Sequence, residues 1–164
     1  MHFMLALLLA LVTVTTGMFA AARQSDAAVL ATASKDLAAE VCEDMVRDSL
    51  IAAAGESLAS PQRGTWAGHR YTCTYGFGDG TLQVRVDVMK SRAGARARFL
   101  ATRNDARLPS TLYGIGQEAF KAGDGAVVAR KDNFLLEVDP SRLPDRLNRD
   151  SLAWSTTRAI FDCW

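Results

Sequence analysis

The fold is decided by residues 69–89, whose sequence is HRYTCTYGFGDGTLQVRVDVM. Apolar and polar side chains alternate in two runs, residues 69–77 and 81–89, which is the period of a strand with one buried face. Between them lies Gly78-Asp79-Gly80, and glycine and aspartate tolerate the positive φ of tight hairpin turns. The stretch therefore predicts an antiparallel β-hairpin. The residues expected on its buried face are Tyr71, Cys73, Tyr75, Phe77, Leu82, Val84, Val86 and Val88.

Three other segments have the spacing of an amphipathic helix, with apolar side chains at three- and four-residue intervals. The first can be capped by Ser34 and ends at Gly55, and residues 56–66 after it are loop-like in composition. The second is rich in alanine and ends before Pro109, because the residue before proline disfavours helical backbone. The third can be capped by Asp150. The predicted helices are residues 35–54, 92–106 and 151–163.

Three short strands are predicted after the second helix, at residues 117–121, 125–130 and 134–139. Pro140 is expected to end the last of them, because proline cannot donate to a strand ladder. The predicted order is α-β-β-α-β-β-β-α, without the βαβ alternation that gives parallel crossovers. Residues 35–164 are thus expected to form a single α+β domain, an antiparallel sheet of about five strands with helices packed on it.

The N-terminal segment is apolar, and residues 2–22 contain no Asp, Glu, Lys or Arg. Its most apolar part, Phe3 to Val14, has the length of a signal-peptide core, and Ala20 to Ala22 supplies a small-residue cleavage site. The same run, about 20 residues, can also span ~30 Å of hydrocarbon, and a buried core helix is a third alternative. We predict a signal peptide or an N-terminal membrane anchor over residues 1–22 and a flexible tether over residues 23–34. The domain would then lie outside the cytoplasm.

The three cysteines would be in an oxidising compartment after export. Cys42 falls on the apolar side of the first helix and Cys73 on the buried face of the hairpin, so a disulfide between them would join helix to sheet. In the chain-entropy view such a bond stabilises by about 3.5–4 kcal/mol. A bond between Cys42 and Cys163 is the alternative, and three buried reduced thiols are a third. We favour the bond between Cys42 and Cys73, with Cys163 free.

The charge of the chain is nearly balanced, with 19 basic and 18 acidic residues, which argues against a nucleic-acid partner. Basic residues nevertheless gather on the second helix. At about 100° per residue, four of them fall within about 60° of one another. These are Arg92, Arg96, Arg103 and Arg107. Such a stripe could meet anionic lipid headgroups, a cell-wall polymer or an acidic partner. The alternative is a solvated face whose arginine stems cover apolar surface.

The sequence has no local catalytic or metal-binding motif. Beyond residues 1–22, His69 is the one histidine, and G-x-S-x-G, C-x-x-C, H-E-x-x-H and calcium-loop patterns do not occur. Gly114 to Ala119 matches G-x-G-x-x-A, but a dinucleotide-binding turn needs a strand before it and a helix after it. We expect no cofactor and no metal. Carboxylates that the fold brings together are not visible in sequence.

Several short motifs occur in a characteristic order. They are VCE (41–43), YTCTY (71–75), LQVRV (82–86), YGIGQEAF (113–120), VVARKDN (127–133) and CW (163–164). In this order they resemble a loose family of small exported or membrane-tethered actinobacterial domains of unknown function. The resemblance covers most of residues 36–164. It implies an antiparallel α+β domain outside the membrane, without an established activity or catalytic residues to transfer.

The sequence therefore favours a non-enzymatic binding or accessory domain outside the cytoplasm. Its expected partner is a cell-envelope component or another exported protein, and the membrane itself if the N-terminal segment is not cleaved. A cell-envelope hydrolase that works through carboxylates assembled by the fold is the alternative, and a purely structural or assembly role is the third.

Overall fold

The structure is a computed structural model that describes residues 32–164. The signal peptide or anchor predicted over residues 1–22, and residues 23–31 of the predicted tether, lie outside the described residues. Residues 32–39 are helical. Within the described part of the chain, no helix is both long and apolar enough to cross a membrane.

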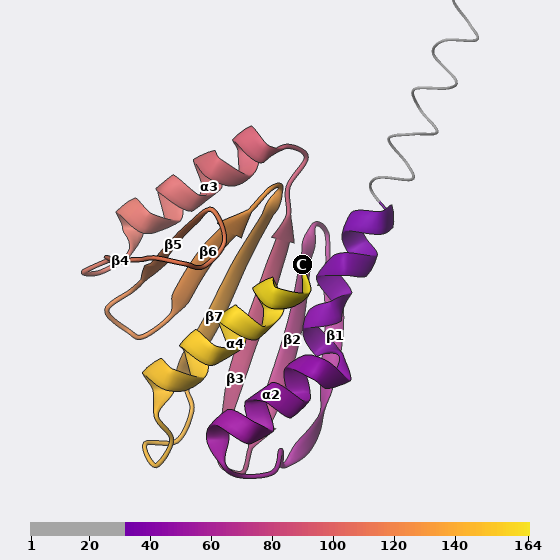
Figure 1. The fold of residues 1–164 in the computed structure, drawn as a ribbon, viewed down its shortest axis with the longest axis vertical. Coiled ribbons are helices and arrows are strands. Elements are labelled where there is room, and N and C mark those ends of the chain that lie inside the picture. Colours follow the sequence, from indigo (N-terminus) through magenta and orange to yellow (C-terminus); the bar gives the residue numbers. More distant parts are fainter. Residues whose placement is uncertain (1–31) are drawn as a thin grey trace, which may run out of the picture. The chain divides into compact units, whose positions relative to one another are not determined.

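In the described part of the chain, seven antiparallel strands form one sheet in the order β1-β2-β3-β7-β6-β5-β4 (Figure 1). The strands are β1 (Ser60–Ala67), β2 (Arg70–Phe77), β3 (Gly80–Val88), β4 (Ser110–Leu112), β5 (Glu118–Lys121), β6 (Val127–Lys131) and β7 (Phe134–Arg142). Two meanders, β1–β3 and β4–β7, meet where β3 pairs with β7. The predicted α+β class and antiparallel sheet are confirmed. The expected number of about five strands is wrong.

The hairpin predicted from residues 69–89 is formed by β2 and β3. Their register is unbroken from the pair Arg70 and Asp87 to the pair Phe77 and Gly80. Gly78 has the positive φ, 60°, that the turn requires. The side chains expected on the buried face are buried, except Val88, which is partly buried against the same core.

The two strands missing from the prediction are the two edges of the sheet. The loop predicted over residues 56–66 is wrong, because β1 begins at Ser60. The pairing of β1 with β2 is irregular between Ser60 and Arg63, and the proline at position 61 falls in this interval, where an edge strand tolerates it. At the other edge, β4 is three residues long, too short for its alternation to stand out. The first edge strand was therefore missed because of its loop-like composition, and the second because of its short length.

Besides the helical residues 32–39, the described part of the chain contains a 3-10 turn and three further helices: η1 (Glu40–Cys42), α2 (Asp44–Ala54), α3 (Arg92–Asp105) and α4 (Arg149–Cys163). α2 and α4 contact each other and cover one face, which holds the main core, and α3 packs on the opposite face against β6 and β7 (Figure 1). We call the latter the α3 face. The continuous helix predicted over residues 35–54 is wrong, because the backbone of Glu43 is extended and separates η1 from α2.

Two predicted element ends are also corrected. Pro140 does not end β7, because the register of β7 against β3 shifts at this point and the missing N–H falls in the irregularity. Asp150 does not cap α4. Asn148 does so, with its side-chain oxygen 3.0 Å from the backbone nitrogen of Ser151, and Asp150 accepts a hydrogen bond from the Lys121 ammonium at 2.6 Å.

Candidate functional site

A row of side chains crosses all seven strands on the α3 face. The strand register makes its members neighbours in the order Thr65, Thr72, Arg85, Glu137, Val128, Phe120 and Thr111. The row is polar from β1 to β7 and apolar over β6 and β5. α3 covers the apolar part, where Phe99 packs on Phe120 with ring centroids 5.4 Å apart. The boundary between the part of the row that α3 covers and the polar part therefore lies at Glu137.

Arg85 organises the charges in the polar part of this row. Its guanidinium lies 2.6 Å from the Glu137 carboxylate and 3.2 Å from that of Asp139, and it also donates to the side chain of Gln83. Burial opposes ionisation of Asp139, but hydrogen bonds from Ser141 and the charge of Arg85 outweigh it and hold the pKa of Asp139 below its ordinary value. Arg85 is thus engaged by side-chain oxygens of three residues of the chain itself.

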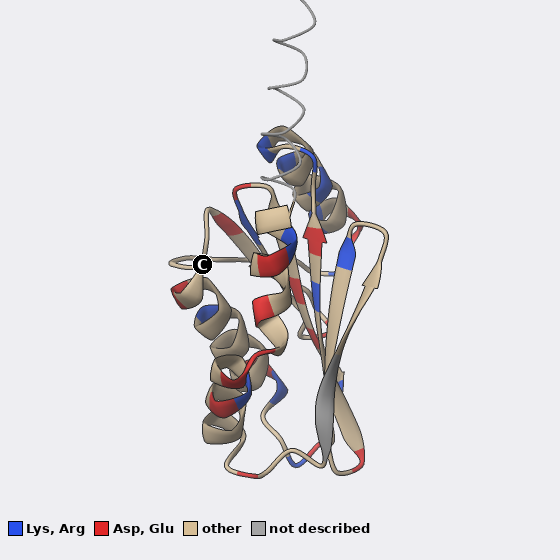
Figure 2. Ribbon diagram, turned by 90° about the vertical axis from the view of Figure 1, so that its right-hand side faces the viewer, with Lys and Arg blue, Asp and Glu red and all other residues tan. Residues whose placement is uncertain are grey.

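A second ion pair on the same face joins Arg70 to Asp87. The guanidinium contacts both carboxylate oxygens, at 2.6 and 2.8 Å, although the Asp87 side chain is only 5% exposed. This bidentate contact, followed by the charge of Asp87, raises the pKa of Arg70 against the opposing effect of burial. Figure 2 shows basic (blue) and acidic (red) positions on the strands of the sheet.

A groove with a volume of about 440 Å³ lies between α3 and this sheet face. One wall is formed by side chains at positions i, i+4 and i+7 of α3, which share one side of the helix. These are Arg98, Thr102 and Asp105. The floor contains Phe120, Val128 and Glu137. One end is formed by Arg107 and the β5–β6 turn with Asp124, held together by a hydrogen bond from the Gly123 nitrogen to the Arg107 carbonyl at 2.7 Å.

Charged side chains without a partner among the described residues border the groove. Within residues 32–164, the side chains of Arg98, Arg107 and Asp105 make no hydrogen bond or ion pair. Asp124 uses one carboxylate oxygen, 3.1 Å from the backbone nitrogen of Ala126. Unpaired guanidinium and carboxylate groups beside one cavity are available to a ligand of complementary charge.

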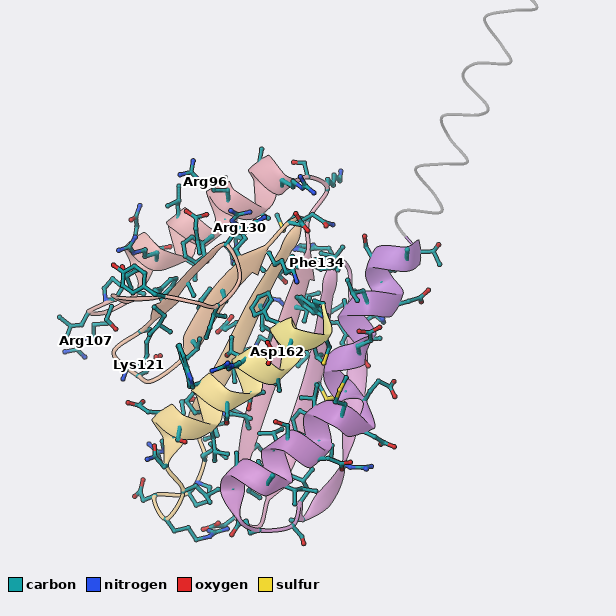
Figure 3. The ribbon with its side chains drawn as sticks, in the orientation of Figure 1. Arg96, Arg107, Lys121, Arg130, Phe134 and Asp162 are labelled. Atoms are coloured by element: carbon teal, nitrogen blue, oxygen red, sulfur yellow. A yellow bond between two sulfur atoms is a disulfide. The ribbon has the colours of Figure 1, made fainter. Side chains whose placement is uncertain are left out.

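The four arginines of the predicted stripe are placed differently from one another. Arg92 pairs with Asp132 at 3.0 Å, Arg96 lies 3.6 Å from Glu118, and Arg103 donates to the Thr111 hydroxyl at 3.1 Å. Arg107 is not on the helix, because α3 ends at Asp105 and the backbone of Ala106 is extended. Figure 3 shows Arg96 on α3 and Arg107 at the opposite end of this region, near β4.

Of the residues that line the groove, Arg107 belongs to the predicted stripe, whereas Arg98 and the carboxylates do not. Arg98 lies on the other side of α3 from Arg92 and Arg96 and is therefore not part of that stripe. The available signal was its spacing to Thr102 and Asp105, which places the three on one side of the helix. A single such triplet is too common to identify a site without the sheet opposite it.

The predicted disulfide between Cys42 and Cys73 is present, with Cα atoms 5.6 Å apart, and it joins η1 to β2. Cys163 is not in a disulfide. Its thiol donates to the Ala159 carbonyl at 2.9 Å and lies 3.6 Å from the sulfur of Met45. Burial, followed by the charges of Glu40 and Asp162, raises the pKa of this thiol.

Within residues 32–164, no group of three or more His, Cys, Asp or Glu side chains is placed to hold a metal ion. No family model, curated protein or solved structure matches the chain. The function therefore has to be inferred from the geometry and charge of the groove.

Proposed function

We propose that this chain is a non-enzymatic binding or accessory domain that acts outside the cytoplasm and holds its ligand in the groove between α3 and the sheet. The main support is the contrast in pairing on the α3 face. Arg85 and Arg70 are satisfied by carboxylates of the chain itself, whereas Arg98 and Arg107 beside the groove have no partner among the described residues. A volume of about 440 Å³ falls within the range of ligand sites, roughly 300–1,000 Å³.

The proposed location rests on the disulfide and on the apolar N-terminal segment. A disulfide between Cys42 and Cys73 persists in oxidising compartments and is rare in the cytosol. Residues 1–22 would deliver the domain there, as a cleaved signal or as an anchor. The partner is then a component of the cell envelope or another exported protein, as the resemblance to exported actinobacterial domains also implies.

A hydrolase is the second candidate, because three carboxylates line the groove: Asp105, Asp124 and Glu137. Cleavage of a glycosidic bond requires one of two carboxyl groups to donate a proton. Glu137 already accepts from Arg85 at 2.6 Å, and Asp124 accepts from the backbone of Ala126. Both carboxylates therefore act as acceptors in the structure. Asp105 is the remaining carboxylate of the groove, and glycosidic cleavage requires a pair.

The test is to map binding on the full chain with its disulfide intact. The ¹⁵N-labelled protein is titrated with envelope extract from the source cells, and amide shifts are recorded. We expect the shifts to cluster at Arg98, Asp105 and Ala122, and to disappear in the double variant Arg98→Gln/Arg107→Gln. Shifts confined to the α2 and α4 side, or none at all, would contradict the proposal. New hydrolysis products that vanish in Asp105→Asn would favour the hydrolase instead.

A further inference from the structure

We infer that the groove takes a short extended peptide, about three residues long, with a free amino group and a free carboxylate. The inference deepens the proposed function and rests on the groove being the ligand site. It follows from the way in which charge is distributed along the groove.

The two ends of the groove have opposite net charge. At the end formed by the β5–β6 turn lie Asp105, Asp124 and Arg107, which sum to one negative charge. Glu137 lies farther from this turn, because it pairs with Val128, the second residue of β6 after the turn. Its charge is balanced by Arg85 at 2.6 Å. Arg98 therefore gives this other end one positive charge. The groove is polarised along its length.

The length of the groove matches a short peptide. Arg98 and Asp105 are seven residues apart on α3, which at ~1.5 Å per residue is about 10 Å along the helix. An extended chain advances roughly 3.3–3.6 Å per residue, so about three residues cover this distance. The carboxylate of the peptide can form a bidentate contact with the Arg98 guanidinium. Its ammonium group can lie at the turn, between Asp105 and Asp124.

Ligands with a single kind of charge fit less well. A purely anionic group meets Asp105 and Asp124 at one end of the groove, and a purely cationic group meets Arg98 at the other. Juxtaposed like charges cost binding energy and exclude such partners. Phe120 and Val128 form an apolar floor, and Ala106 and Ala122 add partly exposed apolar surface to the lining. The groove therefore suits small uncharged side chains. Tri-alanine is the simplest probe with all these features.

The experiment measures binding of tri-alanine to the full chain by calorimetry, next to N-acetyl-tri-alanine and tri-alanine amide. We expect tri-alanine to bind and each blocked peptide to bind about tenfold or more weakly, since each blocking group removes a charge-assisted hydrogen bond. Di-alanine, which is too short to reach both ends, should also be weaker. Equal binding of the blocked peptides, or no binding of tri-alanine, would overturn the inference.

The variants assign each end. Arg98→Gln should lower the affinity for tri-alanine and N-acetyl-tri-alanine but leave that for tri-alanine amide unchanged. Asp105→Asn should lower the affinity for tri-alanine and tri-alanine amide but leave that for N-acetyl-tri-alanine unchanged. Arg92→Gln is the matched control, because Arg92 is an exposed arginine of the same helix that pairs with Asp132 and does not line the groove. Unfolding midpoints confirm that each variant is folded.

If the peptides do not bind while envelope extract still shifts the groove amides, only the peptide inference is contradicted. If both fail, the proposed function fails too.

Discussion

The hydroxyl of Tyr75 donates a hydrogen bond to the backbone carbonyl of Val41, directly beside the disulfide that joins Cys42 to Cys73. Two adjacent residues of η1 are thus tied to two positions of β2 that point to the same side of the sheet. Tyr75 and Val41 are both fully buried. The hydrogen bond and the disulfide connect η1, which precedes α2, to β2. Each should make its own contribution to the free energy of unfolding.

Tyr75→Phe should lower the free energy of unfolding by about 1–3 kcal/mol, because the variant leaves the buried Val41 carbonyl without a donor. Urea unfolding followed by circular dichroism measures the change. Tyr113→Phe is the control, since Tyr113 is 83% exposed, and it should change stability by less than about 0.5 kcal/mol. Equal effects of the two substitutions would contradict a role of the Tyr75 hydroxyl in stability.

The same residue makes stability depend on alkaline pH. Burial, with a smaller effect of Tyr71, raises the pKa of Tyr75 well above its ordinary value. An unfolded tyrosine titrates near pH ~10, so the unfolded chain loses this proton first. The contribution of the protonated Tyr75 hydroxyl to the free energy of unfolding is therefore fully present below about pH 10 and is lost as the pH rises further. Unfolding free energies measured from pH 8 to 12 should fall less steeply for Tyr75→Phe. Parallel curves would refute this. Tyr71, whose pKa burial also raises, accounts for a smaller remaining slope.

Removal of the disulfide in Cys42→Ala/Cys73→Ala should lower the free energy of unfolding by about 3.5–4 kcal/mol, as expected from chain entropy for this loop. The bond closes a sequence separation of 31 residues, which fixes that expectation. Denaturant titration gives the value. Cys163→Ala, which removes a thiol outside the bond, is the control and should have a much smaller effect. A double variant as stable as this control would show that the crosslink does not constrain the unfolded chain.

The thiol count and the N-terminus can be determined together from intact masses. Without reduction, the denatured protein should take up one alkyl group, at Cys163, and after reduction three, because Cys42 and Cys73 are bonded. In the folded protein, Cys163 should react more slowly than an exposed thiol at neutral pH, since its raised pKa lowers the thiolate fraction. Three reactive thiols without reduction would contradict both the disulfide and the oxidising location. The same spectrum reports whether residues 1–22 are removed.

The elements predicted well from sequence are those that carry a local signal. The hairpin of β2 and β3 combines alternation over both strands with a glycine-aspartate turn, so pattern and turn chemistry agree. β1 lacks such a pattern because it is an edge strand with a proline inside an irregular stretch, and an edge strand does not need an unbroken ladder. The break at Glu43 directly follows Val41 and Cys42, which contact β2, and helical periodicity does not reveal such tertiary contacts.

The candidate site was harder to predict, for a related reason. Counting arginines on α3 identifies charge but not the carboxylates that neutralise it, and these come from other elements. Asp132 in the β6–β7 turn and Glu118 in β5 engage Arg92 and Arg96. What distinguishes Arg98 is the absence of such a partner within residues 32–164, a property of the folded sheet. Pairing across elements therefore decides which charges are available to a ligand.

The turn before β5 supplies a last prediction, in which two glycines of similar backbone geometry should respond differently. Gly114 and Gly116 both have positive φ, 78° and 55°. A Cβ at Gly114 would have nothing within 4 Å, whereas one at Gly116 would lie 2.6 Å from the Arg130 carbonyl oxygen. That oxygen accepts from the Gln117 nitrogen at 2.8 Å, so it cannot move without disturbing the contact between β5 and β6.

Gly114→Ala should therefore cost only the conformational strain, about 1–2 kcal/mol. Gly116→Ala should cost at least about 1 kcal/mol more, because the β6 backbone must shift away from the new methyl group. Urea unfolding of both variants gives the difference. Hydrogen exchange at Gln117 locates it, and faster exchange in Gly116→Ala alone is expected. If both variants lose the same stability, the close approach of Gly116 to β6 does not determine the choice of glycine, and backbone conformation alone accounts for both positions.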